Sequence, residues 1–235
     1  MQKFWTLLLA LTITFTGFSQ RKSKDDAPAW TTANTSAFKF RDIGPATTSG
    51  RIADLAVNPE NKAEMYLALA SGGVWKTVNA GTTWQPLTDK EAFYSTGCIT
   101  LDPNNSGTIW LGTGENVGGR HVGIGHGIYV SHDDGKSWKF SGLKNSEHIS
   151  KIIVHPDNSD IIWVAAQGPL WSSGGERGVY KSIDGGETWK PINNGIPKEK
   201  GNMAISVSRT NSNKIYALVE SDSDQEKGGL FVSAN

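Results

Sequence analysis

An eight-residue phrase recurs along this chain and constrains its fold more than any other feature. Ser131–Trp138 reads SHDDGKSW and Ser182–Trp189 reads SIDGGETW, and both fit the pattern S-x-D-x-G-x-[ST]-W. Thr77–Trp84 reads TVNAGTTW, and a fourth copy begins at Ser233. The copies begin 54, 51 and 51 residues apart. Self-similarity at such a period indicates a repeat architecture.

Each copy is predicted to form the tight turn of a β-hairpin, because strand-like apolar runs flank it. The Asp or Asn can accept backbone hydrogen bonds, the Gly can adopt a positive φ, and the indole can cover the apolar side of the hairpin. An Asp that recurs in every repeat satisfies the same local turn each time, so we interpret the phrase as structural rather than catalytic. The residues with these structural roles are Asn79, Gly81, Trp84, Asp133, Gly135, Trp138, Asp184, Gly186 and Trp189.

Four strand-like segments recur in each repeat. In the third repeat they are residues 149–155, 161–166, 178–182 and 189–192. Four short antiparallel strands in about 50 residues are typical of one blade of a β-propeller. The sequence therefore predicts an all-β fold, a β-propeller of four-stranded antiparallel blades.

The expected propeller occupies residues 38–235 and is incomplete, with about three and three-quarter blades. The blades are expected at residues 50–88, 97–143, 149–193 and 203–235. Because propellers need about four to eight blades to close a ring, we expect further blades from a longer parent chain.

Residues 1–19 have the features of a secretory signal peptide. A positive charge precedes an uncharged apolar run, residues 4–18, and small residues, Gly17 and Ser19, precede the expected cleavage point. An uncleaved anchor is the alternative, but the run is short for a membrane span. We expect a secreted, periplasmic or cell-surface protein with no stable membrane insertion after cleavage. Residues 20–37 are polar and are expected to be disordered or loosely attached.

Composition excludes several classes of partner and site. The 23 basic and 23 acidic residues balance, which argues against nucleic acid or an anionic membrane surface as the partner. Cys98 lies in an apolar run and is expected to be buried rather than nucleophilic. We expect no metal and no cofactor. The acidic run 222–226 could offer oxygen ligands to calcium, but it lacks the frame of a known calcium loop, so a solvated loop is favoured.

Candidate site residues lie in loops of unequal length on the face opposite the repeated turns. The second repeat inserts residues 112–127, the third inserts 167–177 and the fourth inserts 220–228. Unequal loops on a regular scaffold commonly carry binding residues, although simple solvation is the alternative for each polar residue. The binding candidates are Arg51, Glu115, Asn116, Arg120, His121, His126, Trp171 and Arg177, with Tyr94 and His148 near the starts of inner strands. The catalytic candidates are Glu115, Glu147 and Glu176.

The repeated phrase resembles the Asp-box, or bacterial neuraminidase repeat, of sialidases, xyloglucanases and sortilin-type propellers. Longer strings such as IGPATTSGRIADLAVNP and GTGENVGGRHVGIGHGIYVS resemble the sortilin N-terminal-type propeller of large secreted bacterial proteins that are often catalogued as glycosyl hydrolases. The resemblance implies the fold. It does not specify an activity, because the Asp-box occurs in enzymes and non-enzymes alike.

Two enzyme families within this resemblance can be compared residue by residue. Xyloglucanases of this architecture carry a catalytic Asp in a T-D-[IV]-G-G-[AV]-Y stretch, and the matching LASGGVW has Ala70 at that position. Sialidases hold the substrate carboxylate with three arginines, for which Arg51, Arg120 and Arg177 are the candidates here.

Two functions follow as expectations. The main interpretation is a secreted, non-catalytic, sortilin-type module whose loop-bearing face binds a protein, peptide or glycan. The alternative is a xyloglucanase-like or sialidase-like glycoside hydrolase that uses Glu115 with Glu147 or Glu176 as acid and base. Such enzymes place two carboxyl groups about 5–9.5 Å apart, so the surroundings of these carboxylates discriminate between the two. A spacer module in a cell-surface assembly is a third possibility.

Overall fold

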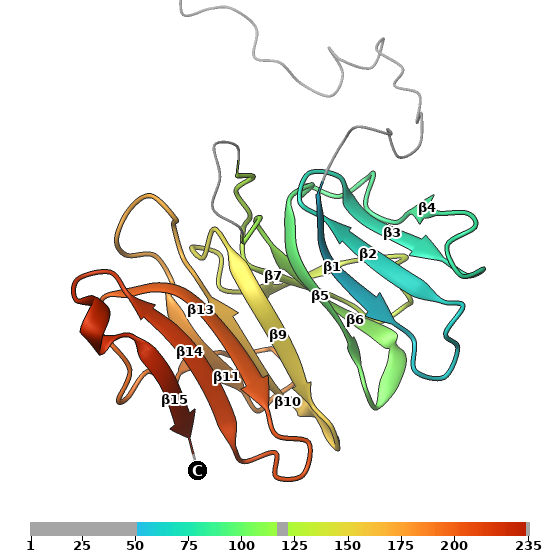
Figure 1. Cartoon of the computed structure of the whole chain (residues 1–235). Coiled ribbons are helices and arrows are strands. Elements are labelled where there is room, and N and C mark those ends of the chain that lie inside the picture. Colours follow the sequence, from blue (N-terminus) through green and yellow to red (C-terminus); the bar gives the residue numbers. More distant parts are fainter. Residues whose placement is uncertain (1–50, 117–121, 234–235) are drawn as a thin grey trace, which may run out of the picture. The chain divides into compact units, whose positions relative to one another are not determined.

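The four repeats form successive antiparallel sheets in the computed structural model of the chain (Figure 1). The structure describes residues 51–116 and 122–233. The expected signal peptide, residues 1–19, the polar segment 20–37 and the loop residues Arg120 and His121 lie outside these ranges. The described residues belong to one compact unit, Ile43–Asn235. None of the helices in this part of the chain has the length and apolar character needed to span a bilayer.

The first two repeats each form a four-stranded sheet in which strands adjacent in sequence pair with each other. The strands of the first sheet are β1 (Ile52–Val57), β2 (Met65–Leu69), β3 (Gly73–Thr77) and β4 (Gln85–Pro86). The strands of the second sheet are β5 (Thr96–Asp102), β6 (Asn105–Thr113), β7 (Ile128–Ser131) and β8 (Lys139–Gly142).

The third repeat has the same order, and the fourth has three strands within the described residues. The strands of the third sheet are β9 (Ile149–His155), β10 (Asn158–Ala166), β11 (Gly178–Ser182) and β12 (Lys190–Pro191). The strands of the fourth sheet are β13 (Lys200–Val207), β14 (Ile215–Ser221) and β15 (Gly229–Ser233), with the short 3-10 helix η2 (Gln225–Lys227) between β14 and β15.

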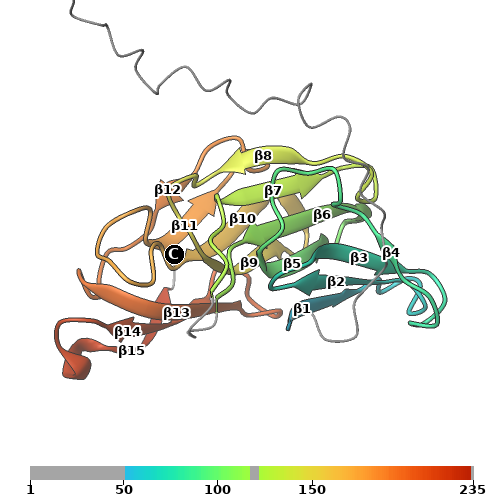
Figure 2. The same ribbon diagram turned by 90° about the horizontal axis from the view of Figure 1, so that it is seen from above.

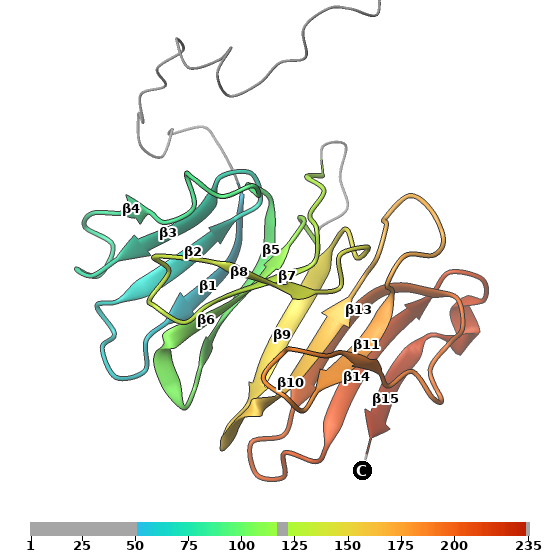
Figure 3. The same cartoon turned by 180° about the vertical axis from the view of Figure 1, so that it is seen from behind.

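The sheets are arranged like the blades of a fan (Figure 2). The first strands of the four sheets, β1, β5, β9 and β13, lie toward the centre, and each contacts the next. The last strand of the second sheet, β8, lies at the periphery and stands in front of β5 when the molecule is seen from behind (Figure 3). The prediction of an all-β fold built from four-stranded antiparallel propeller blades is confirmed.

The core consists of apolar layers between adjacent sheets, and strand alternation explains how a middle sheet serves two layers. Consecutive side chains of a strand point to opposite faces. On β5, Cys98 packs toward the third sheet and Ile99 toward the first. On β10, Ile162 faces the second sheet and Trp163 the fourth. Strands buried on both faces read as continuous apolar runs. Burial also raises the pKa of the Cys98 thiol to about 12.

The fourth sheet buries one face and exposes the other. Ile215 and Val219 of β14 pack against the third sheet, whereas Leu218 and Leu230 on the opposite face are 58% and 66% exposed. A groove of about 630 Å³ runs between the outer part of the third sheet and β14–β15. Its lining includes Ile192.

Candidate functional site

The repeated phrases form turns that share one hydrogen-bond pattern. In the second copy, the Ser131 hydroxyl donates to Asp133 Oδ1 at 2.8 Å, and the Ser137 N–H donates to the same oxygen at 2.9 Å. Asp184 accepts the equivalent pair of bonds at 2.7 and 2.9 Å, and Asn79 accepts them at 2.9 Å each. The carboxylates of the two aspartates are therefore engaged within their own turns.

Hydrogen bonding lowers the pKa of both aspartates. The Ser137 hydroxyl, followed by its N–H, lowers the pKa of Asp133 to about 2, and Thr188 does the same for Asp184. A carboxyl group stabilised as its anion cannot act as a general acid near neutral pH. This chemistry suits a turn better than a catalytic centre.

The second and third turns also dock on the preceding sheet, a feature that sequence reasoning missed. A Cβ atom added at Gly186 would lie 2.4 Å from the Trp110 ring of the second sheet. The Trp189 indole N–H donates to the Ser141 carbonyl at 2.5 Å, and its ring meets Trp110 edge-on, with centroids 6.4 Å apart. The indole thus packs on the neighbouring sheet, and not only on its own hairpin as the sequence led us to expect.

The second turn adds polar contacts to the same junction. Asp134, at a positive φ of 67°, accepts hydrogen bonds from the Tyr66 hydroxyl and the Lys76 ammonium group, both in the first sheet. Burial, helped by hydrogen bonds to Asp134 and Glu64, holds the pKa of Tyr66 well above its usual value. These groups tie the second sheet to the first.

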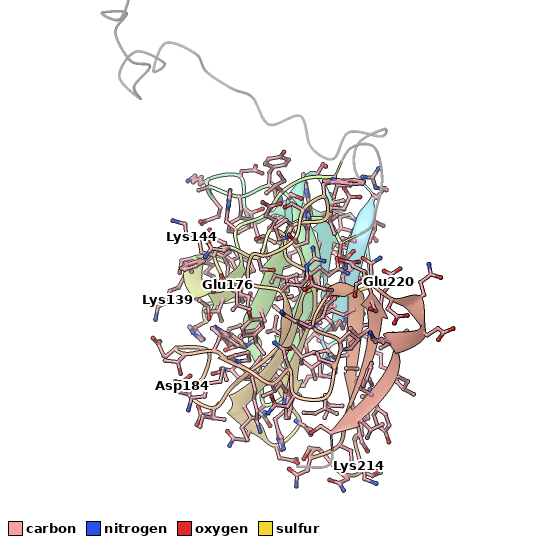
Figure 4. All side chains as sticks on the ribbon, turned by 90° about the vertical axis from the view of Figure 1, so that its left-hand side faces the viewer. Lys139, Lys144, Glu176, Asp184, Lys214 and Glu220 are labelled. Atoms are coloured by element: carbon pink, nitrogen blue, oxygen red, sulfur yellow. The ribbon has the colours of Figure 1, made fainter. Side chains whose placement is uncertain are left out.

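The opposite face carries the unequal loops. Figure 4 shows Glu176 and Glu220 above Asp184 and Lys214, nearer the loop-bearing end of the sheets. Glu176 belongs to the β10–β11 loop, whereas Asp184 belongs to a repeated turn. The two faces of the fold therefore carry different sets of polar residues.

Glu115 is a buried ion-pair partner on the loop-bearing face. It is 2% exposed, and the Arg51 Nε donates to its Oε1 at 2.6 Å. The backbone N–H of Glu115 donates to the Gly123 carbonyl and to the Ser95 hydroxyl. Its second oxygen, Oε2, is buried without a hydrogen-bond partner among residues 51–116 and 122–233. In this arrangement the carboxylate links the first sheet to the β6–β7 loop and does not face solvent.

His148 lies beside this pair. It is 1% exposed, and burial lowers its pKa despite a hydrogen bond with the Glu115 backbone. Its backbone carbonyl accepts from the Gln167 N–H at 2.8 Å. Because the pKa lies below its usual value near 6.5, the imidazole is neutral at pH 7.

The other two catalytic candidates differ in their surroundings. Glu176 Oε2 accepts the Asn145 N–H at 2.7 Å, which braces the β10–β11 loop. Glu147 is half-buried, and its backbone carbonyl accepts the Gly125 N–H. Within the part of the chain that the structure describes, the Glu147 carboxylate makes no hydrogen bond or ion pair. Of the three carboxylates, Glu147 has the least constrained side chain.

The remaining binding candidates are spread over the second and third sheets. Asn116 Nδ2 donates to the Gly97 carbonyl at 3.1 Å, and the backbone N–H of His126 donates to the Thr113 hydroxyl at 2.8 Å. Trp171 projects from the β10–β11 loop and is 78% exposed.

Arg177 fastens the β10–β11 loop to the fourth sheet. One guanidinium nitrogen pairs with Asp222 at 2.9 Å and also donates to the Lys200 carbonyl. The other donates to the carbonyls of Pro169 and Ser172. Arg51 and Arg177 are thus each paired with a carboxylate of the chain, and the third arginine candidate, Arg120, lies outside the described residues.

Comparisons with known proteins point to one architecture. The model of the family described as "Sortilin, neurotensin receptor 3" matches residues 126–235. A xyloglucanase from Paenibacillus sp. is 30% identical over 141 residues, which is 58% of this chain. An oligoxyloglucan-reducing end-specific xyloglucanase from Emericella nidulans is 28% identical over 109 residues, or 45% of this chain. The matched part of the chain spans 12% of the length of each of these two curated relatives.

Solved structures agree with these matches. A GH74 enzyme from Niastella koreensis superposes with a TM-score of 0.57 at 25% identity, covering 77% of this chain and 27% of that one. The GH74 xyloglucanase from Xanthomonas campestris gives a TM-score of 0.59 at 17% identity, covering 77% and 28%. The fold is that of a β-propeller. The propeller relatives that these matches identify by activity are xyloglucanases.

Proposed function

We propose that this chain is part of a secreted propeller protein of the glycoside-hydrolase type, and that its loop-bearing face holds a glycan chain. The observation that carries the proposal is the exposed indole of Trp171 on the face where polar loops gather. An aromatic ring with an apolar face and a polar edge suits a sugar, which also has both. The xyloglucanase relatives support a glycan over other ligands. We assign the repeated turns to the Asp-box type.

We assign to the described residues the role of binding the glycan rather than cleaving it. Ala70 stands where xyloglucanases of this type carry an Asp, and it is buried with its N–H bonded to the Arg51 carbonyl. The Glu115 carboxylate is held in an ion pair with Arg51. Glycoside hydrolysis needs two carboxyl groups across the scissile bond. The hydrolytic form of the proposal therefore rests on Glu147, with Glu176 or a carboxylate outside the described residues as its partner.

The test is binding and hydrolysis measured on the same protein. Titration calorimetry with xyloglucan oligosaccharides is expected to detect binding, and Trp171→Ala is expected to weaken it at least tenfold. Release of reducing ends from xyloglucan measures hydrolysis, and Glu147→Gln tests the hydrolytic form. Absence of glycan binding by the wild-type protein contradicts the proposal.

A sortilin-type peptide receptor is the second candidate, because the sortilin family model matches the last 110 residues, 126–235. A peptide array applied to the same protein separates the two. Peptide binding without glycan binding favours this second candidate.

We also propose that the rest of the fourth repeated turn, supplied by a longer parent chain, packs in the groove between the third and fourth sheets. The groove beside β15 has the position that the third repeated turn fills on the second sheet, where Gly186 and Trp189 dock. A synthetic peptide of residues 182–192 is expected to occupy this groove and raise the melting temperature. A Trp-to-Ala version of the peptide is the control, and an unchanged melting temperature with the unmodified peptide contradicts the proposal.

A further inference from the structure

A small polar pocket opens on the loop-bearing face between the third and fourth sheets. It has a volume of about 90 Å³, and its lining includes Gln167, Leu170, Arg177, Glu220 and Asp222. Ordinary ligand pockets have about 300–1,000 Å³. This pocket is therefore of a size to take one edge of a sugar ring and not an oligosaccharide.

Gln167 lies at the end of β10 and supplies an unpaired acceptor. The residue is 5% exposed, and its Oε1 is buried without a hydrogen-bond partner among the described residues. Buried amide oxygens in folded proteins nearly always have a donor. Because the residue lines the pocket, a hydroxyl group entering from solvent is the donor that fits.

The charged groups of the pocket favour a neutral ligand over an anion. Arg177 is already paired with Asp222 at 2.9 Å. Glu220 accepts two hydrogen bonds from Asn202, from the backbone N–H at 3.1 Å and from Nδ2 at 3.0 Å. The lining thus contains one cation and two carboxylates, an excess of one negative charge. A carboxylate brought in by a ligand meets like charge at short range.

Trp171 stands in the sequence between two residues that lie at the pocket. Its sequence neighbour Leu170 lines the pocket, and the carbonyl of its other neighbour, Ser172, accepts from the pocket-lining Arg177 at 3.1 Å. The indole is nevertheless 78% exposed. A flat apolar ring on the loop that lines a set of hydrogen-bond acceptors matches the two kinds of surface on a pyranose.

We propose that the pocket and Trp171 form a subsite for one neutral hexopyranose unit. The sugar ring stacks on the indole, and one hydroxyl or hydroxymethyl group enters the pocket and donates to Gln167 Oε1. This inference rests on the proposed glycan-binding function and names the class of sugar that the face accepts.

The first experiment separates binding from stability by titrating variants with a neutral xyloglucan oligosaccharide. Gln167→Leu is expected to weaken binding at least tenfold while leaving the melting temperature unchanged or raised, because it removes an unpaired buried amide. Trp171→Ala is expected to weaken binding similarly. Ile124→Ala, an exposed apolar side chain on the β6–β7 loop, is the matched control and is expected to bind like wild type. A Gln167→Leu protein that binds normally overturns the subsite.

The second experiment tests the charge argument. The wild-type protein is expected to bind the neutral oligosaccharide at least tenfold more tightly than an oligogalacturonide of equal length. Glu220→Gln keeps an acceptor for Asn202 but removes the charge. It is therefore expected to reduce the ratio of the two affinities, neutral oligosaccharide over oligogalacturonide, at least threefold. An unchanged ratio overturns the inference. If the wild-type protein binds no glycan, the proposed function itself fails; if it binds glycans but none of the pocket variants matters, only the subsite fails.

Discussion

The two faces of this propeller are stabilised by different kinds of contact. On the turn face, Asn79, Asp133 and Asp184 make the same local hydrogen bonds in three copies. On the loop face the ion pairs are unique and join distant segments, as Arg51 does with Glu115 and Arg177 with Asp222. The recurring contacts of the turn face maintain the scaffold, whereas the loop-face contacts, each made once, are where one propeller can differ from another in its ligand.

The largest expected effect tests whether the turn face is held by docking between sheets. Trp189→Ala removes a half-buried indole, its edge-on contact with Trp110 and its hydrogen bond to Ser141. We expect a loss of about 3 kcal/mol in the free energy of unfolding, measured by urea denaturation. Trp84→Ala is the matched variant. Because Trp84 contacts its own turn and no preceding sheet among the described residues, we expect about 1 kcal/mol. Equal losses from both variants contradict docking as the source of the stability.

A glycine pair separates docking from backbone strain. Gly186 has a φ of 84° and a neighbouring ring 2.4 Å from the position of an added Cβ, whereas Gly195 has a φ of 86° and no atom within 4 Å. Gly195→Ala measures the cost of the positive φ alone, about 1 kcal/mol. Gly186→Ala adds a steric clash, for a total of about 2–3 kcal/mol. The same denaturation experiment applies, and similar values for the two variants are incompatible with a close-packed turn.

Acid titration sharpens the role of the repeated aspartates. Hydrogen bonds lower the pKa values of Asp133 and Asp184 to about 2, below the unfolded value of about 3.9. Their contribution to stability is therefore present above about pH 4 and is lost as the pH falls toward 2. Asn is the residue that the first copy uses at this position, Asn79. Replacing both aspartates by Asn is expected to make the free energy of unfolding less dependent on pH between about pH 4 and pH 2. An equally steep acid dependence in this double variant means that other carboxylates control it.

The smallest expected effect on stability belongs to the loop face. Trp171→Ala removes a side chain that is 78% exposed, so the free energy of unfolding is expected to change by less than about 0.5 kcal/mol. Glycan binding is expected to fall in the same protein. A large loss of stability indicates that Trp171 packs against another part of the protein instead of serving a ligand.

The local structure of the repeats was predictable from sequence. The strand ranges expected at 149–155 and 178–182 are those of β9 and β11, because alternation and turn residues act over short distances. The docking of the second and third turns on the preceding sheets was not predicted, although a signal existed. Tyr66, Trp110 and Trp163 occupy equivalent positions on the second strands of successive sheets, opposite Lys76, Val130 and Lys181. An aromatic residue repeated at one position marks the surface on which the next turn sits.

The candidate site was less predictable than the scaffold. Sequence reasoning chose Glu115 as a catalytic candidate, but the carboxylate lies against Arg51, which is 64 residues away in the sequence. The placement of one sheet relative to the next decides such a contact, and no local pattern reports it. Gln167, next to the well-predicted end of β10, gave no signal because an unpaired amide is recognisable only from its surroundings.

Hydrogen–deuterium exchange with and without a neutral xyloglucan oligosaccharide would test directly whether recognition and scaffold occupy opposite faces. We expect the glycan to slow exchange in residues 167–177 and 220–228 and to leave the turns at 131–138 and 182–189 unchanged. Protection confined to the turns, or no protection on the loop-bearing face at saturating glycan, would contradict that division.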